Sequence, residues 1–135
     1  MVLPIAKAAR NASTKEQPPG TGTTAAERLA ANAAAGKAAE RVIAKELVKA
    51  GHTILGSNVG IQTSRGLRMV DHLIMTPSGE LLAIEVKSGG AVRRASQLAK
   101  DAALGAEGGV IVGKNAPDFL RGTSVMIDTV EAVVP

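Results

Sequence analysis

The stretch "DHLIMTPSGELLAIEVK", at residues 71–87, constrains the fold more than any other part of this chain. Two apolar runs flank a short polar turn, which is typical of a β-hairpin. The turn "PSG" suits a three-residue loop, with proline in a type I turn and glycine in the left-handed conformation. Thr76 then pairs with Glu80, and this pairing fixes the register of both strands.

Two acidic residues and a lysine interrupt these apolar strands. The register places Asp71 opposite Glu85, and because side chains alternate along a strand, Lys87 lies on the same face as Glu85. Carboxylates about 5 Å apart repel and raise each other's pKa unless a cation lies nearby. A solvated charged face is the plain alternative, but apolar residues also lie on this face: Met69, Leu73, Leu81 and Ala83. We expect the main core on the opposite face, which carries Val70, Ile74, Leu82, Ile84 and Val86.

The chemistry that needs these groups together is metal-assisted hydrolysis of a phosphodiester bond. Asp71 and Glu85 offer the hard oxygen ligands that Mg²⁺ or Mn²⁺ prefers, with Zn²⁺ as a further option. The backbone carbonyl of Val86 is a candidate third ligand. Lys87 is then close enough to position or deprotonate a water, or to stabilise the pentavalent phosphate.

A long helix is predicted before the hairpin. "TAAE", at residues 24–27, has the form of a capping box, and Gly51 suits the helix end. At 100° per residue one face of this helix collects small and apolar residues: Leu29, Ala33, Gly36, Ile43, Ala44 and Leu47. Glu40 lies within this stripe, so its carboxylate is either buried at a cost or has something to bind.

The rest of the pattern gives the fold class. We expect strands over 52–63, 67–76 and 80–88, a helix over 91–105, a buried strand over 108–113 and one or two final strands. The fold class is therefore α/β. The predicted order of elements is αβββαβ followed by a further strand, and these elements form one domain over residues 24–135. Residues 1–23, which include "PPG", are predicted to be a flexible linker.

Composition narrows the function. The chain has no cysteine, which excludes disulfides, thiolate zinc sites and cysteine nucleophiles. Its single aromatic residue, Phe119, argues against stacking platforms for bases. The formal net charge is +4, which suits a polyanionic partner. Arg93, Arg94 and Lys100 are candidates for contacts with phosphates, the alternative being a solvated helix face. No apolar run is long enough for a membrane span.

Asp71 followed by "EVK" at 85–87 resembles the PD-(D/E)xK nuclease superfamily, whose restriction-endonuclease-like core has the order αβββαβ around a mixed sheet flanked by helices. In that family an acidic residue of the first helix often joins the metal site, and Glu40 matches it. A polar residue of the following helix commonly touches the phosphate or water, and Gln97 matches it. Val70 stands where the motif name expects proline, which is often absent.

The domain also looks like the C-terminal toxin modules of bacterial contact-dependent inhibition and other polymorphic toxin systems. That likeness implies delivery on a secreted carrier, action in the target-cell cytoplasm and neutralisation by a small, acidic immunity protein. The sequence thus predicts a metal-dependent endonuclease acting on tRNA or DNA. The alternatives are a nuclease of DNA repair or restriction, an inactive nucleic-acid-binding module and an interaction domain of a secretion system.

Overall fold

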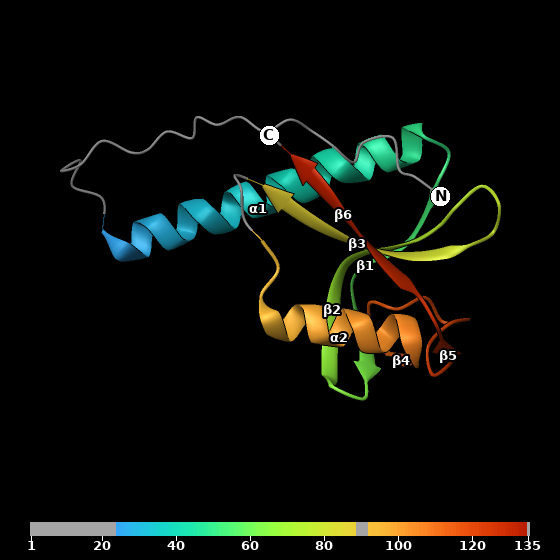
Figure 1. Cartoon of the computed structure of the whole chain (residues 1–135). Helices are drawn as coiled ribbons and strands as arrows, with labels where there is room; N and C mark the ends of the chain where they lie inside the picture. The colour runs from blue at the N-terminus through green and yellow to red at the C-terminus, as the bar shows by residue number, and fades with distance from the viewer. Residues whose placement is uncertain (1–23, 89–91, 135) are drawn as a thin grey trace.

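The computed structural model describes residues 24–88 and 92–134, so the predicted linker over 1–23 lies outside the described residues. The helices are α1 (Ala25–Lys49) and α2 (Ala95–Ala106). The strands are β1 (Thr53–Thr63), β2 (Gly66–Met75), β3 (Leu81–Ser88), β4 (Gly109–Val112), β5 (Ser124–Val125) and β6 (Asp128–Val134). They form one sheet in the order β5-β4-β1-β2-β3-β6 (Figure 1).

The sheet is mixed, as predicted. β3 and β6 run parallel, and the other neighbouring strands run antiparallel. α1 packs on β1, β3 and β6, and α2 packs on β2, β6 and β1. The element order is therefore the predicted αβββαβ followed by two further strands, which is consistent with a restriction-endonuclease-like α/β core.

The ends of α1 follow local sequence rules. The hydroxyl of Thr24 accepts a hydrogen bond from the backbone N–H of Glu27, whose carboxylate accepts one from the Thr24 N–H. At the other end Gly51 has a φ of 93°. The N–H of His52 donates to the carbonyl of Leu47, which closes the helix in a Schellman motif. Both predicted boundaries are confirmed.

The predicted apolar face of α1 is correct only in the C-terminal half of the helix. Ala39, Ile43 and Leu47 are its buried residues, whereas Leu29 is 69 % exposed. Periodicity predicts which residues share a face, but it does not predict how far along the helix a neighbouring element extends. The N-terminal half of α1 therefore stands away from the sheet (Figure 1).

The β2–β3 hairpin has the predicted register. The N–H of Thr76 donates to the carbonyl of Glu80, and Gly79 has a φ of 91°, as the three-residue turn requires. His72 pairs with Ile84, and Met75 pairs with Leu81. Extending this register by one residue places Asp71 beside Glu85.

The core differs from the expectation of one main apolar face. Hydrophobic clusters cover both faces of the sheet, because a helix packs on each. On the α1 side Ile74 and Ile84 pack with Ile43. On the α2 side Leu73 and Ala83 pack with Leu104. The acidic residues of the hairpin consequently lie in a sheet that is buried on both sides.

Candidate active site

Asp71 lies where β2 separates from β3. The paired positions of the two strands end at His72 and Ile84. One residue further, Oδ2 of Asp71 accepts a hydrogen bond of 2.7 Å from the backbone N–H of Val86. The Asp71 carboxylate thus accepts a hydrogen bond from a backbone amide of β3, just beyond the last paired residues of the two strands. In a strand, the N–H and C=O of one residue point to the same side, so the Val86 carbonyl also points toward β2.

The surroundings of Asp71 disfavour its charged form. Burial raises the pKa of Asp71 to about 6, against the lowering effect of the Val86 hydrogen bond. The negative charges of Glu85 and Glu40 raise it further. Carboxylates on two other elements, α1 and β3, therefore act on the Asp71 carboxylate, and a cation placed near it would relieve this repulsion.

Glu85 is held by two cations. Its Oε1 lies 2.8 Å from Nη2 of Arg68, and its Oε2 lies 3.2 Å from Nζ of Lys87. Glu85 is buried, with 6 % of its surface exposed. The predicted proximity of Glu85 and Lys87 is thus present, while the contact with Arg68 was not predicted.

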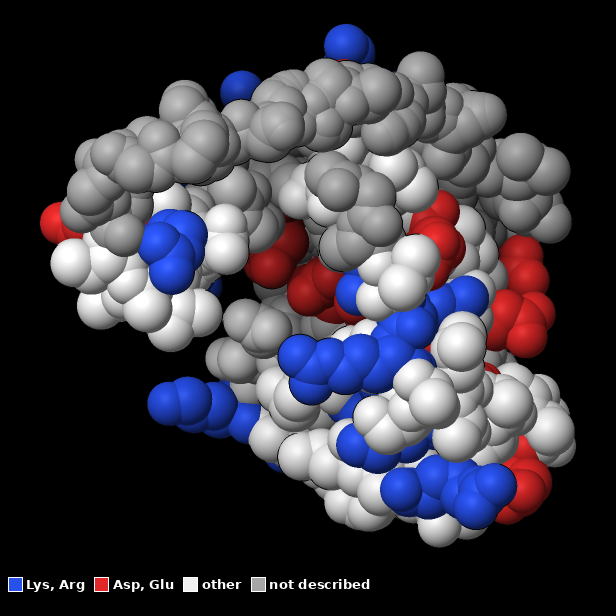
Figure 2. All heavy atoms as spheres, turned by 60° about the vertical axis from the view of Figure 1, so that its left-hand side comes forward, with Lys and Arg blue, Asp and Glu red and all other residues white. Residues whose placement is uncertain are grey.

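Glu40 borders a surface hollow between α1 and the β1–β2 pair. The hollow is lined by Lys37, Glu40, Arg41, Ala44, Ser57 and His72. His72 ties the elements together, because its Nε2 donates to the Glu40 carbonyl at 3.1 Å and its Nδ1 lies 2.8 Å from Oγ of Ser57. Figure 2 shows acidic side chains deep in a hollow of the molecule, with lysine and arginine side chains nearby.

Gln97 is not brought to the carboxylates by any described contact. Its side-chain oxygen accepts a hydrogen bond of 3.0 Å from the N–H of Arg94, so it caps the start of α2. The helix begins at Ala95 rather than at residue 91. The predicted basic helix face is therefore wrong, because Arg93 and Arg94 precede the helix.

The predicted phosphate-binding residues have different surroundings. Arg93 forms ion pairs with Asp101 at 2.8 Å and with Glu131 at 3.0 Å. Arg94 is exposed at the N-cap of α2. The side chain of Lys100 lies over Gly66, where a Cβ atom would come within 3.3 Å of its Cε.

Sequence reasoning missed Arg68 and Asp101, which are both buried. Nε of Arg68 lies 2.6 Å from Oδ1 of Asp101, so β2 and α2 are joined by a buried ion pair. A signal was available, because Arg68 lies two residues before Val70, a core residue on the α2 side of the sheet. It is the same signal, a charge at an apolar position, that singled out Glu40.

The donor set fits a hard divalent cation. It consists of oxygens from Asp71, Glu85 and the Val86 carbonyl, which are the hard ligands that such an ion prefers. Burial is the main cause of the raised pKa of Asp71, and the negative charges of Glu85 and Glu40 add to it. Within the described part of the chain, no three ligating side chains are already gathered as a metal site. An ion held here would rely on two carboxylates, one carbonyl and several waters, which is the coordination that Mg²⁺ tolerates well.

Comparison with known proteins assigns the family. The nuclease-related domain (NERD) matches residues 35–103, just over half of the chain. A search of curated proteins and a search of solved structures each gave no match. The matched segment runs from the middle of α1 into α2 and contains Glu40, Asp71, Glu85 and Lys87. It supports a nuclease domain of PD-(D/E)xK-like type, and the chain belongs to the nuclease-related domain family.

Proposed function

We propose that this chain is a metal-dependent endonuclease that hydrolyses phosphodiester bonds of DNA or tRNA. One observation carries the proposal. Asp71 lies opposite Glu85 in the strand register, just beyond the last β2–β3 backbone pair, and accepts a hydrogen bond from the Val86 amide, which supports a site formed by these two carboxylates and the Val86 carbonyl. Membership of the nuclease-related domain family supports a nuclease.

The residues have separate roles in this proposal. Asp71, Glu85 and the Val86 carbonyl would hold the ion, with Glu40 as an outer acidic group. A bound divalent cation lowers the pKa of a nearby water and offsets charge on the scissile phosphate. Lys87, whose side chain is 14 % exposed, would leave Oε2 of Glu85 and donate a hydrogen bond that positions the attacking water or stabilises the pentavalent phosphate; it could accept a proton from that water only after losing its own proton.

Positive charge near the acids supports a polyanionic substrate. Lys37 and Arg41 line the same hollow as Glu40 and are both exposed. They stand one helical turn apart on α1, a spacing that lets them contact neighbouring phosphates of one strand. Arg94 and Lys100 remain predicted contacts on the other side of the sheet.

The experiment is cleavage of supercoiled plasmid and of total tRNA by the purified chain, with Mg²⁺, Mn²⁺ or Zn²⁺ and with EDTA. We expect cleavage of at least one polymer that EDTA abolishes and that Lys87→Ala reduces by on the order of 10²–10⁴-fold. Binding without cleavage under every metal favours the inactive binding module. Neither binding nor cleavage favours an interaction domain.

The predicted toxin role stays a prediction. It rests on the sequence alone, on a small domain without cysteine that follows the linker-like residues 1–23 with "PPGTGT". If it holds, expression of the chain in the cytoplasm arrests growth, and a small acidic protein encoded beside it relieves the arrest. Growth that continues during such expression would favour a repair or restriction nuclease over a toxin.

No helix in the described part of the chain is both long and apolar enough to cross a membrane.

A further inference from the structure

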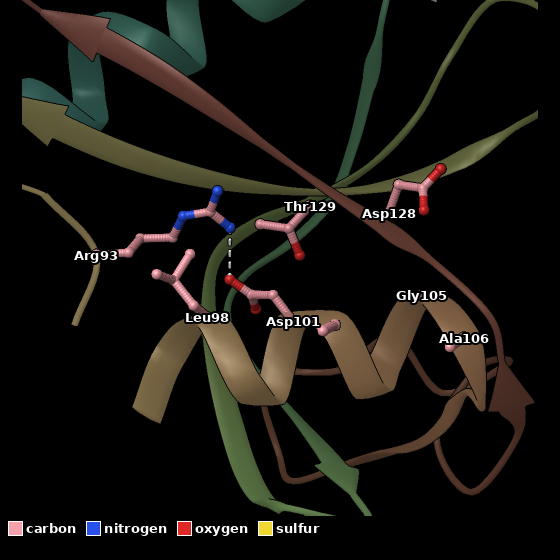
Figure 3. A pocket seen from close by; sticks show the side chains of 8 residues that line it. Arg93, Leu98, Asp101, Gly105, Ala106, Asp128 and Thr129 are labelled. Atoms are coloured by element: carbon pink, nitrogen blue, oxygen red, sulfur yellow. Dashed lines mark hydrogen bonds and ion pairs between the residues drawn. The ribbon is translucent and has the colours of Figure 1, made fainter. Parts of the chain in front are cut away.

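Glu85 begins a chain of alternating carboxylates and guanidinium groups. Arg68 joins Glu85 to Asp101, and Arg93 joins Asp101 to Glu131. Figure 3 shows the contact between Arg93 and Asp101 beneath β6. Glu85 and Glu131 are register partners on β3 and β6, where two like charges would repel. The intervening cations let both glutamates occupy neighbouring positions.

Arg68 is fixed on all sides. Its Nη2 donates to Glu85 at 2.8 Å, its Nε donates to Asp101 at 2.6 Å, and its Nη1 donates to the carbonyl of Met69 at 2.8 Å. Its side chain is only 4 % exposed, so it cannot bind a nucleic acid directly. The planar guanidinium allows these three directions at once, which a lysine ammonium on its flexible stem does not reproduce.

Asp101 is held in its charged form by Arg68 and Arg93. Burial alone would raise the pKa of Asp101, but hydrogen bonds from Arg68 and Arg93 lower it below its ordinary value. Asp101 therefore stays charged and holds Arg68 from α2. Charge-assisted, two-point contacts of this kind fix direction as well as distance.

The two cations on Glu85 differ in mobility. Arg68 on Oε1 is clamped and buried, whereas Lys87 on Oε2 is a single ammonium with 14 % of its side chain exposed. The contact that can open is therefore the one with Lys87. Oε1 stays with Arg68, and Oε2 is the oxygen left for a ligand.

We propose that Arg68, anchored by Asp101, is a positioning residue that holds Oε1 of Glu85 and thereby directs Oε2 to a divalent cation. This inference rests on the proposed metal-dependent function. Buried ion pairs contribute little net stability compared with apolar packing, which is consistent with a role in geometry. Loss of such outer contacts weakens metal affinity or activity on the order of 10–100-fold.

The test is Mn²⁺ titration by calorimetry with Arg68→Lys and Asp101→Asn. Arg68→Lys keeps the positive charge but removes the planar guanidinium that donates in several directions. Asp101→Asn leaves Arg68 without its anchoring negative charge. Each is expected to raise the Kd for Mn²⁺ on the order of 10–100-fold in protein that circular dichroism shows to be folded. The double variant is expected to bind Mn²⁺ no more weakly than the weaker-binding single variant, because both substitutions disrupt the same Asp101–Arg68–Glu85 chain of contacts. The cleavage rate is expected to fall in parallel.

Arg121→Lys is the matched control. Arg121 also forms several contacts, donating to Asp118 at 2.7 Å and to the Ala116 carbonyl at 2.6 Å. None of these contacts involves Asp71, Glu85 or Glu40. Its substitution should leave the Kd within threefold of the wild-type value. The inference is overturned if a folded Arg68→Lys or Asp101→Asn variant also stays within threefold, or if neither variant folds. If the wild-type chain itself binds no Mn²⁺ and cleaves nothing, the proposed function fails instead.

Discussion

The carboxylate of Asp71 accepts a 2.7 Å hydrogen bond from the backbone N–H of Val86, at the point where β2 leaves β3. This bond fixes one carboxylate oxygen of Asp71 against β3, while burial and the negative charge of Glu85 on the same strand raise the pKa of Asp71. The arrangement stores negative charge in a partly buried place, which costs the metal-free protein stability and favours a cation. The first two predictions follow from this relationship.

Asp71→Asn should stabilise the metal-free protein at neutral pH. The pKa of Asp71 is about 6 in the folded chain and 3.8 ordinarily, so the folded state holds this proton more tightly. The stability that this proton gives is present below pH 3.8 and is lost as the pH rises through 6. Asparagine keeps an acceptor for Val86 without the charge. We expect a higher thermal midpoint for the variant at pH 7.5 in EDTA, and a difference that shrinks toward pH 4. A lower midpoint at pH 7.5 would contradict this.

Mn²⁺ affinity should depend on the same ionisation. Below about pH 6 the ion must displace the Asp71 proton, so affinity is expected to fall by about tenfold per pH unit. Above pH 7 it should level off. Calorimetry at pH 5.0, 6.0 and 7.5 measures this, and proton release should appear as a buffer-dependent heat. Equal affinity at all three values would show that Asp71 is not a ligand.

Removing Arg68 altogether should destabilise the fold. Arg68→Ala leaves the carboxylates of Glu85 and Asp101 buried without this partner, at a cost of about 3–5 kcal/mol in the free energy of unfolding. Urea unfolding measures it. The control is Glu46→Gln, which breaks an exposed ion pair with Lys49 and should cost less than about 1 kcal/mol. Similar losses of unfolding free energy in both variants would mean that the buried contacts of Arg68 contribute no more to stability than an exposed ion pair.

Nucleic-acid binding should depend on the part of α1 beside Glu40. Lys37→Ala combined with Arg41→Ala is expected to weaken binding of any sequence and to lower the salt slope by about one for each phosphate that these side chains neutralise. Lys45→Ala with Lys49→Ala is the matched control, since it has the same spacing on the same helix and borders a different hollow. Fluorescence anisotropy from 50 to 200 mM salt measures the affinity for nucleic acid and its salt dependence in both double variants. Equal slopes for both would refute phosphate binding by Lys37 and Arg41.

Local rules account for what the sequence predicted well. The Thr24 capping box, the left-handed Gly51 and the 77–79 turn each depend on residues close together in the chain. The turn carries the most information, because one register determines the neighbours of every residue on both strands. That is why Asp71 and Glu85 could be placed side by side without coordinates.

The failures involve contacts between distant elements. Leu29 is exposed because the neighbouring strands do not reach it, and helical periodicity carries no information about that length. The start of α2 depended on the Gln97 side chain bonding to the Arg94 N–H. The pairing of Arg68 with Asp101 joins residues 33 positions apart. A charge at a core position signals a partner, but only the packing of α2 on the sheet identifies it.

The most direct test of the central claim is the cleavage rate of Glu85→Gln in Mg²⁺, compared with Glu80→Gln from the same hairpin. Glu80 is exposed and its role in the turn is played by backbone groups, so its substitution removes a charge without touching the site. The account predicts that Glu80→Gln cleaves at the wild-type rate, and that folded Glu85→Gln in Mg²⁺ is no faster than the wild-type chain in EDTA. Cleavage by Glu85→Gln at the rate of Glu80→Gln would contradict it.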